Sequence, residues 1–462
     1  MNNHERLRAT IYTLIATLSL TTPRKSAADD RLDIKTLYYQ ESDGRMRVVS
    51  PTLLYEHELS TTMKVKLDGI YNSISGATPS GAPPLKTTTT YRTVTTATPP
   101  TSGNTYEDDD RNDDRNDDRE DEDDDKSRGK FRRILHNYPG GYMAKAGATP
   151  APRPAPTPSG GGSTSSGGGV NTTTVADSKV VYDKAGKAPR AQVDDERFGV
   201  NLELTKVLDN HTVAAQISLS NESDYTSQAL ALRNSIDFNQ KNTTLLLGVS
   251  YAHDVIDATT MESSETKDSL DGMIGVTQVL DKKTTFSINL TLGTADGFLT
   301  DPYKVVELNG SIVPEKRPDS RTKSVLFLAL NRYVDSLNGA AELSYRYYDD
   351  SFGVKGQTFG FSWYQKLSPH WTLRPSVRYY TQTAADFYDI QFSGSPSYYS
   401  SDYRVSEMSA IGYGMKLIWF PTDKLSFDIA VDRYVQSGED GITADDMYPE
   451  ALSVMAGLRI WF

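Results

Sequence analysis

The chain has 462 residues, a formal net charge of -12 at pH 7 and no cysteine. The lack of cysteine excludes disulfides, thiolate metal sites, cysteine nucleophiles and a lipidated N-terminal cysteine, and the negative charge argues against nucleic acid as a partner. Length alone fits either several soluble domains or one large all-β unit.

The first 28 residues have the pattern of a secretory signal peptide. Arg6 and Arg8 supply the basic region, a mostly apolar run covers 11–20, and Ser26-Ala27-Ala28 offers a small-residue cleavage site. The pattern predicts export, with an amphipathic first helix as the alternative. No later segment holds the roughly 18 consecutive apolar residues of a membrane helix, so membrane insertion is expected to use strands.

Candidate β-strands follow from Arg31 to the C-terminus. The first group lies within 29–75 and the second within 194–462, separated by an insertion of different composition at 76–193. Sixteen strands are predicted, an even number as in bacterial single-chain barrels: 31–40, 45–58, 62–75, 194–208, 211–222, 226–238, 243–256, 268–280, 283–295, 319–334, 338–349, 355–367, 371–384, 402–419, 424–437 and 450–462.

The insertion begins with a Thr-rich stretch, continues through an acidic block at 107–125, and ends in Pro-rich and Gly-rich runs. Such a segment buries too little apolar surface to offset its ordering entropy, which predicts a mostly disordered extracellular loop. The acidic block could bind calcium loosely. Its interleaved arginines, and the lack of an EF-hand glycine and terminal glutamate, favour a solvated charge run.

The connections between strands alternate in length. Tight turns follow every second strand, as at Asp209-Asn210 and Asp281-Lys282, whereas most intervening connections are longer, as at 296–318 and 385–401. Short periplasmic turns opposite long extracellular loops are typical of transmembrane β-barrels. The sequence therefore predicts an all-β fold, a single transmembrane antiparallel β-barrel of about 16 strands in the outer membrane of a Gram-negative-type cell, with both termini periplasmic.

Apolar and polar residues alternate within several strands, most clearly in the last one. Leu452, Val454, Leu458, Ile460 and Phe462 are expected to face lipid, while the intervening residues, among them Ser453, Gly457 and Arg459, face the lumen. A closing strand that ends in an aromatic residue is also the expected contact with the barrel-assembly machinery. The other expected partners are outer-membrane lipid and small solutes or ions.

Charged residues at inward positions are the candidates for lining a pore. Arg346, Arg374 and Arg378 fall within three consecutive strands and, if they converge, would attract anions through bidentate hydrogen bonds. The alternative is a salt-bridged interior that does not conduct. The full set of pore-lining candidates is Arg346, Arg374, Arg378, Glu342, Lys416, Asp428, Asp432 and Arg459, and Lys64, Lys66, Asp68 and Glu203 are also expected to face inward.

A short motif ending at Thr78 resembles the acceptor motif of proteins that carry FMN through a threonine phosphoester. Asn72 stands where that motif has an acidic residue. Covalent FMN at Thr78 is therefore one hypothesis, and the alternative is that Ser75-Gly76 simply turns the chain out of the third strand. No other cofactor and no metal are expected.

Signals for catalysis are sparse. The chain has no His-Glu-x-x-His and no Gly-x-Ser-x-Gly motif, and its six histidines have no metal-ligand spacing. We therefore expect that the protein is not an enzyme. The long charged loop 301–319 is expected either to fold inward as a constriction or to remain a rim loop.

Several segments resemble the DUF3570 family of outer-membrane β-barrel proteins, and the resemblance covers the mature chain apart from the insertion. The segments are 73–79, 194–198, 301–304 with 315–321, 345–350, and 378–380 with 385–388. The resemblance implies the barrel and its location but no activity.

The sequence as a whole predicts a passive channel or transport-related pore with a mixed-charge lumen. The alternatives are a closed barrel that acts as an envelope scaffold or as part of an extracytoplasmic redox or flavin system, and an outer-membrane hydrolase. The oligomeric state is left open.

Overall fold

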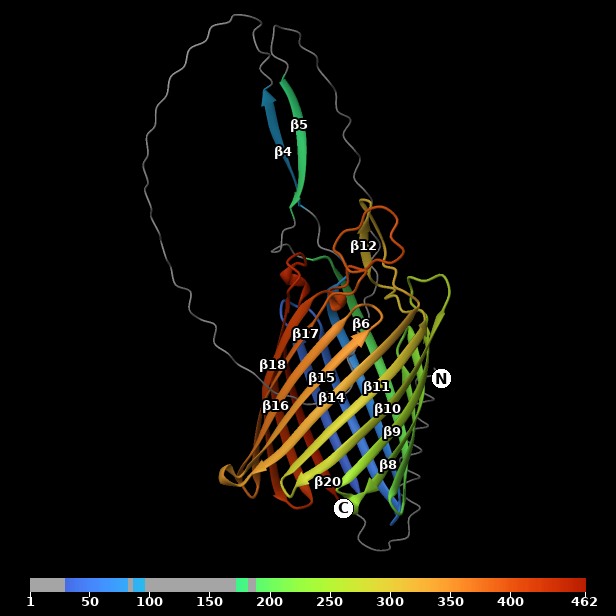
Figure 1. Ribbon diagram of the computed structural model, residues 1–462, viewed down its shortest axis with the longest axis vertical. Coiled ribbons are helices and arrows are strands. Elements are labelled where there is room, and N and C mark those ends of the chain that lie inside the picture. Colours follow the sequence, from blue (N-terminus) through green and yellow to red (C-terminus); the bar gives the residue numbers. More distant parts are fainter. Residues whose placement is uncertain (1–29, 82–85, 96–171, 182–187) are drawn as a thin grey trace, which may run out of the picture.

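The computed structural model describes residues 30–81, 86–95, 172–181 and 188–462. Sixteen antiparallel strands close into one barrel (Figure 1). In ring order they are β1 Arg31–Glu41, β2 Arg47–Ser60, β3 Met63–Pro79, β6 Arg190–Leu208, β7 His211–Asn221, β8 Tyr225–Phe238, β9 Thr243–Ile256, β10 Glu265–Asp281, β11 Thr284–Gly297, β14 Ser320–Val334, β15 Gly339–Asp350, β16 Lys355–Ser368, β17 Trp371–Gln382, β18 Met408–Thr422, β19 Leu425–Gly438 and β20 Glu450–Trp461.

Two strand pairs lie outside the barrel. β4 (Lys86–Thr95) pairs with β5 (Thr172–Val181), and β12 (Val305–Leu308) pairs with β13 (Ser311–Pro314). In the described ranges the helical elements are single 3₁₀ turns: η1 Asn239–Lys241, η2 Asp335–Leu337, η3 Tyr403–Val405 and η4 Asp445–Met447. None of these described turns is long and apolar enough to cross a membrane.

The first and last strands close the ring. β1 and β20 pair along their whole length, from Arg31 opposite Trp461 to Glu41 opposite Ala451. At the far end of this seam the backbone N–H of Asp30 donates to the carbonyl of Phe462 at 3.0 Å, and the reverse bond has the same length. Every strand of the barrel therefore has two neighbours, and no edge is left for pairing with another chain.

Each strand has an apolar outer face and a polar inner face. In β11, Ile288, Leu290 and Leu292 are exposed on the outside, while Asn289 and Thr291 point inward. Because neighbouring side chains on a strand point to opposite faces, this alternation wraps a band of exposed apolar side chains around the barrel. Such a band is the surface that hydrocarbon covers in a membrane barrel.

Aromatic residues gather where strands meet the tight turns. Trp371, which opens β17, stacks on Trp419 of β18 with ring centroids 5.6 Å apart, and Trp419 stacks on Phe427 of β19 at 5.5 Å. Large amphipathic rings at strand ends are typical of the girdle at a bilayer interface.

The two ends of the barrel differ. The tight turns and the C-terminus lie at one end, here called the turn end, and the longer connections gather at the other, the loop end (Figure 1). The longer connections among the described residues are 257–264, 298–319, 383–407 and 439–449.

The sixteen predicted strands and the closed all-β barrel are confirmed. The predicted start of one strand at 402 is wrong, because β18 begins at Met408 and 403–405 form η3. Tyr403 and Val405 have strand-like spacing, but both are buried among the loops, where they pack in two different apolar clusters.

The chain does not turn at Ser75-Gly76 as one hypothesis required. β3 continues to Pro79 and pairs with β6 up to Arg190, so both strands extend into the predicted insertion. Gly76 adopts a φ of 128°, and a Cβ there would collide with the backbone oxygen of Arg45. Residues 1–28, most of 76–193 and the acidic block lie outside the described residues, so the signal peptide and the disordered loop stay predictions.

The two faces of β11 give a matched test of membrane exposure. Leu290→Arg places a charge in the middle of the outer band and should lower the free energy of unfolding in lipid vesicles by about 2–4 kcal/mol. Thr291→Arg adds the same side chain to the inner face and should cost far less. Denaturant titration measures both, and equal losses would contradict the assignment of faces.

Candidate functional site

Most charged side chains of the lumen form ion pairs. Lys416 Nζ lies 2.7 Å from Asp428 Oδ2, and Arg459 makes two 2.7 Å hydrogen bonds to Asp33 across the closing seam. Lys66 pairs with Asp68 at 3.2 Å. These contacts place five predicted inward residues, Lys66, Asp68, Lys416, Asp428 and Arg459, in a paired, mixed-charge interior.

Three predicted pore-lining arginines differ from this pattern. Across the described residues, Arg346, Arg374 and Arg378 form no ion pair with a carboxylate, although all occupy inward positions of β15 and β17. Arg346 lies over the ring of Tyr348 at 5.7 Å and Arg374 over that of Tyr364 at 5.6 Å. We call these three residues the arginine group.

The acidic candidates near the arginine group have other partners. Glu342 is 5% exposed and accepts a 3.2 Å hydrogen bond from the hydroxyl of Tyr364. Asp432 lies on the inner face of β19, the neighbour of β18, and also has an interaction. The structure thus brings the three arginines onto one part of the wall, on the inner faces of β15 and β17.

The lumen is accessible to water. The inward side chains of Arg233, on β8, and Lys64, on β3, are 48% and 45% exposed even though Arg233 is paired with Glu203 and Lys64 with Glu58. A barrel of sixteen strands is wide enough to leave an aqueous interior. Charged groups inside it can therefore meet dissolved ions.

A loop crosses the loop end of the lumen. Residues 298–319 connect β11 to β14, yet Lys304 donates to the carbonyl of Pro79 in β3, and Val305 donates to Ser80 at 2.9 Å. β3 lies six or seven of the sixteen places around the ring from β11 and β14. Because that separation approaches the full diameter, the loop has to span the opening.

A second loop, 383–407 between β17 and β18, packs against the first. Leu308 bridges to Phe392, and Lys316 and Tyr399 exchange two backbone hydrogen bonds at 2.8 and 2.9 Å. We call 298–319 and 383–407 together the cap. The loop predicted to be either a constriction or a rim loop thus lies across the mouth.

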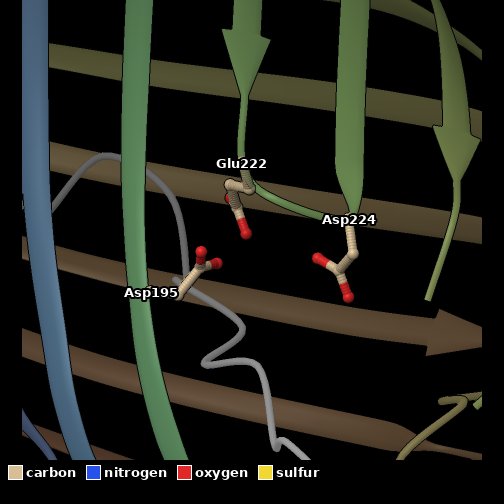
Figure 2. Close-up of side chains that lie close together, drawn as sticks. All are labelled: Asp195, Glu222 and Asp224. Atoms are coloured by element: carbon tan, nitrogen blue, oxygen red, sulfur yellow. The ribbon is translucent and has the colours of Figure 1, made fainter. Parts of the chain in front are cut away.

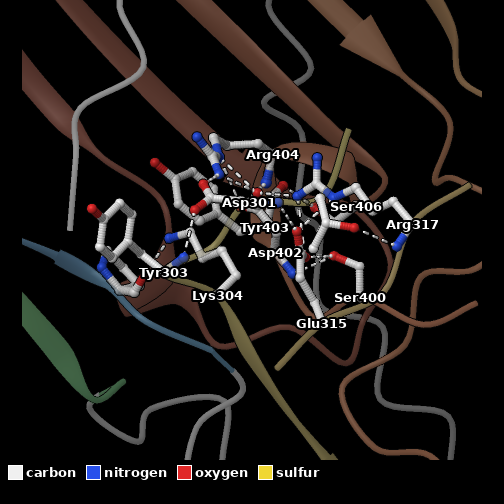
Figure 3. A network of polar contacts seen from close by, with 12 residues as sticks. Asp301, Tyr303, Lys304, Glu315, Arg317, Ser400, Asp402, Tyr403, Arg404 and Ser406 are labelled. Carbon is white, nitrogen blue, oxygen red and sulfur yellow. Dashed lines mark hydrogen bonds and ion pairs between the residues drawn. The ribbon is translucent and has the colours of Figure 1, made fainter. Parts of the chain in front are cut away.

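A buried ionic network joins the two loops of the cap (Figure 3). Arg317 lies between two carboxylates, with 2.7 Å contacts to Glu315 Oε1 and Asp402 Oδ2. Arg404 pairs with Asp402 and Asp301, and Ser400 Oγ donates to Glu315 at 2.5 Å. Because the partners come from both loops, the network holds the loops together.

The electrostatics of the network favour the charged form of Asp402. Burial alone would raise the pKa of Asp402, but the positive charges of Arg404, Lys304 and Arg317 outweigh burial and hold that pKa below its usual value. Burial lowers the pKa of the Lys304 ammonium, and Asp402 partly opposes that shift. Asp402 therefore stays ionised through the mildly acidic range, whereas burial raises the pKa of Glu315 above its usual value and Arg317 partly opposes that shift.

Apolar clusters fix the cap to the barrel rim. Phe352 and Val354, between β15 and β16, pack with Ala385, Phe387 and Val405 of the cap. A second cluster joins Tyr403 of the cap to Met408, Ala188 and the 439–449 loop. A third places Tyr303 of the cap against Met46, Ile74, Ala191, Val193 and Ala258. Sequence patterns indicated none of these contacts, because each joins separate connections.

Thr78, the predicted flavin acceptor, lies near the loop end of β3 opposite Ala191 and is 8% exposed. Attachment of FMN there would require its hydroxyl to become accessible. Covalent FMN therefore stays a prediction.

A family model described as "Protein of unknown function (DUF3570)" matches residues 6–460. No curated protein matches the chain.

Solved structures with a similar arrangement include a bacterial polysaccharide outer membrane secretin, 9% identical over 94% of this chain and 98% of that chain, with a TM-score of 0.42. The outer membrane protein opdK from Pseudomonas aeruginosa is 8% identical, with coverages of 94% and 99% and a TM-score of 0.38. The siderophore receptor PirA from Pseudomonas aeruginosa is 8% identical, with coverages of 94% and 62% and a TM-score of 0.39. The strand pairing of this chain itself establishes the closed barrel.

Arg317 tests whether the ionic network holds the cap. Arg317→Ala leaves Glu315 and Asp402 buried with one positive neighbour fewer, which should make cap opening easier by about 3–5 kcal/mol. Lys316→Ala removes an exposed charge one residue away and should change little. Hydrogen exchange at 298–319 and 383–407 in the folded barrel measures the difference. Equal protection in both variants would contradict the role of the network.

Proposed function

This chain belongs to the DUF3570 family, and we propose that it is an outer-membrane transport barrel for small hydrophilic solutes, with a preference for anions and with passage controlled by the cap. The observation that carries the proposal is the arginine group. Within the part of the chain that the structure describes, its three guanidinium groups have no carboxylate ion partner, whereas the other lumen charges are mostly paired.

The proposed location follows from the outer surface. The exposed apolar band needs hydrocarbon to cover it, and a closed antiparallel ring satisfies its backbone groups without water. By the usual asymmetry of such barrels, the turn end would face the periplasm and the cap the outside. The last strand, ending in Phe462, would be the contact with the barrel-assembly machinery.

The proposed selectivity follows from the chemistry of guanidinium groups. Each presents a planar fork of donors that matches a carboxylate or phosphate, and such bidentate contacts both attract and orient an anion. Passage also requires that the solute leave again, so binding at each site has to be weak or shared. Arg346 and Arg378 both lie close enough to Tyr380 to interact with it electrostatically, which spreads the positive charge along the wall.

The cap supports control of passage. In this structure it spans the mouth, so transport requires the cap to open or to shift. Its buried charges favour discrete closed and open arrangements over gradual loosening, because a partly broken network leaves carboxylates buried without partners.

A closed barrel that scaffolds a partner in the cell envelope is the second candidate, and the same cap favours it. A scaffold would keep the cap shut in every condition. No cofactor and no enzymatic activity are part of either proposal.

Planar-bilayer recording distinguishes the two. We expect little conductance from the wild type, larger conductance from Arg317→Ala, and a reversal potential that shows anion preference. Arg378→Ala in the Arg317→Ala background should reduce the anion-to-cation permeability ratio severalfold, because it removes one of the three guanidinium charges of the arginine group.

Arg433→Ala is the matched control, since Arg433 lies on the outer face of β19 paired with Glu450. It should leave the ratio unchanged. Silence from every variant, in protein shown to be folded by heat-shifted gel migration, would reject transport and support the scaffold.

The flavin hypothesis has its own test. The peptide containing Thr78, isolated from native membranes, should carry the mass of a phosphoester-linked FMN if the motif is used. An unmodified mass in mature protein, with Thr78→Ala as the reference peptide, would reject it.

A further inference from the structure

We infer that Asp195, Glu222 and Asp224 form a binding site for a hard divalent cation of calcium size, where the barrel wall meets the cap. Asp195 lies on the inner face of β6, and Glu222 and Asp224 lie in the short turn between β7 and β8. Figure 2 shows their carboxylates directed toward a common space.

The geometry suits calcium. One carboxylate oxygen from each residue lies within 4.8 Å of the other two. Calcium binds oxygen at roughly 2.3–2.6 Å, so two ligands on opposite sides of the ion are separated by about 4.6–5.2 Å. The three oxygens can therefore share one ion without movement of the backbone.

A second observation points to a ligand. Asp195 is 5% exposed, and its Oδ2 is buried without a hydrogen-bond partner among the described residues. A buried carboxylate oxygen normally has a donor or a cation. Asn72 adds to this, because it is fully buried and neither its side-chain oxygen nor its nitrogen has a hydrogen-bond partner. Asn72 lies opposite Arg197 on the same inner face, next to the pair formed by Ile74 and Asp195.

The charge balance also favours a divalent ion. Arg197 contacts the cluster, with its Nε 3.4 Å from Glu222 Oε1. Lys267 on β10 is paired with Asp254 at 2.9 Å. The three carboxylates and the Arg197 guanidinium together carry two net negative charges, which one calcium ion would neutralise.

The site is joined to the cap by Tyr303. The Tyr303 hydroxyl donates to Asp224 Oδ2, and its ring packs in the apolar cluster that contains Met46, Ile74 and Val193. A cation held by Asp224 would fix the acceptor of that hydrogen bond and thereby anchor the cap. This role deepens the proposed control of passage, whereas cation binding itself stands whether or not the lumen conducts.

Equilibrium dialysis with radioactive calcium on the full chain in detergent tests the site. We expect one saturable calcium site in the wild type and at least tenfold weaker binding in both Asp195→Asn and Asp224→Asn, because each removes a ligand charge. Asp194→Asn is the matched control, since Asp194 is exposed on the other face of β6 and carries the same charge.

The acidic block at 107–125 is identical in every variant, so its weak binding contributes an equal background. Gel migration before and after heating reports whether each variant is folded. Calcium binding that is absent in the wild type, or equal in the wild type and in folded Asp195→Asn or Asp224→Asn, would overturn the site.

Limited proteolysis of the cap tests the coupling. Calcium should slow cleavage within 298–319 severalfold in the wild type and in Asp194→Asn, and should have no effect in Asp195→Asn. Magnesium at the same concentration should protect less, because it demands shorter and more regular coordination. Calcium that binds without protecting the loop would overturn the anchoring role, independently of any conductance result.

Discussion

The structure depends on the pairing of β1 with β20. In hydrocarbon an unpaired backbone N–H or C=O has no water to bond, so a sheet can cross a membrane only if its two edges meet. The seam meets this demand along the whole length of β1, and the Asp33–Arg459 pair joins the same strands on the lumen side. Closure then fixes which side chains face outward and which face the interior.

The two ends of the closed barrel differ in the length of their connections and in what those connections do. At the turn end, connections of two or four residues return each strand directly to its neighbour. At the loop end, longer connections meet above the lumen, where they form the protein's main buried clusters. Among the described residues, the buried apolar clusters therefore lie between the cap and the barrel rim, whereas charged side chains inside the barrel, such as Arg233, are exposed. A fold of this kind separates the membrane-embedded wall from the element that opens or closes it.

Charge is used differently in these two regions. Along the inner wall, charges are paired as in Lys416–Asp428, and the arginine group adds positive charge beside aromatic rings. Within the cap, Asp402 and Glu315 are almost fully buried, so each needs its cation, and removal of one partner is costly. The cluster of Asp195, Glu222 and Asp224 lies between these two cases, because Asp195 and Asp224 are buried while Glu222 is only half-buried and pairs with Arg197.

The sequence by itself determined the sixteen strands, their inner and outer faces and the inward charges, because alternation with a period of two and tight turns are local properties. The cap was decided only by tertiary structure: Tyr303, Asp402 and Arg404 lie in segments whose partners are distant in the chain. Strand-like spacing at 402–407 even predicted a strand there. The cluster of Asp195, Glu222 and Asp224 likewise joins β6 to the β7–β8 turn. No local sequence pattern indicates that Asp195 and Asp224 come together when the strands pair.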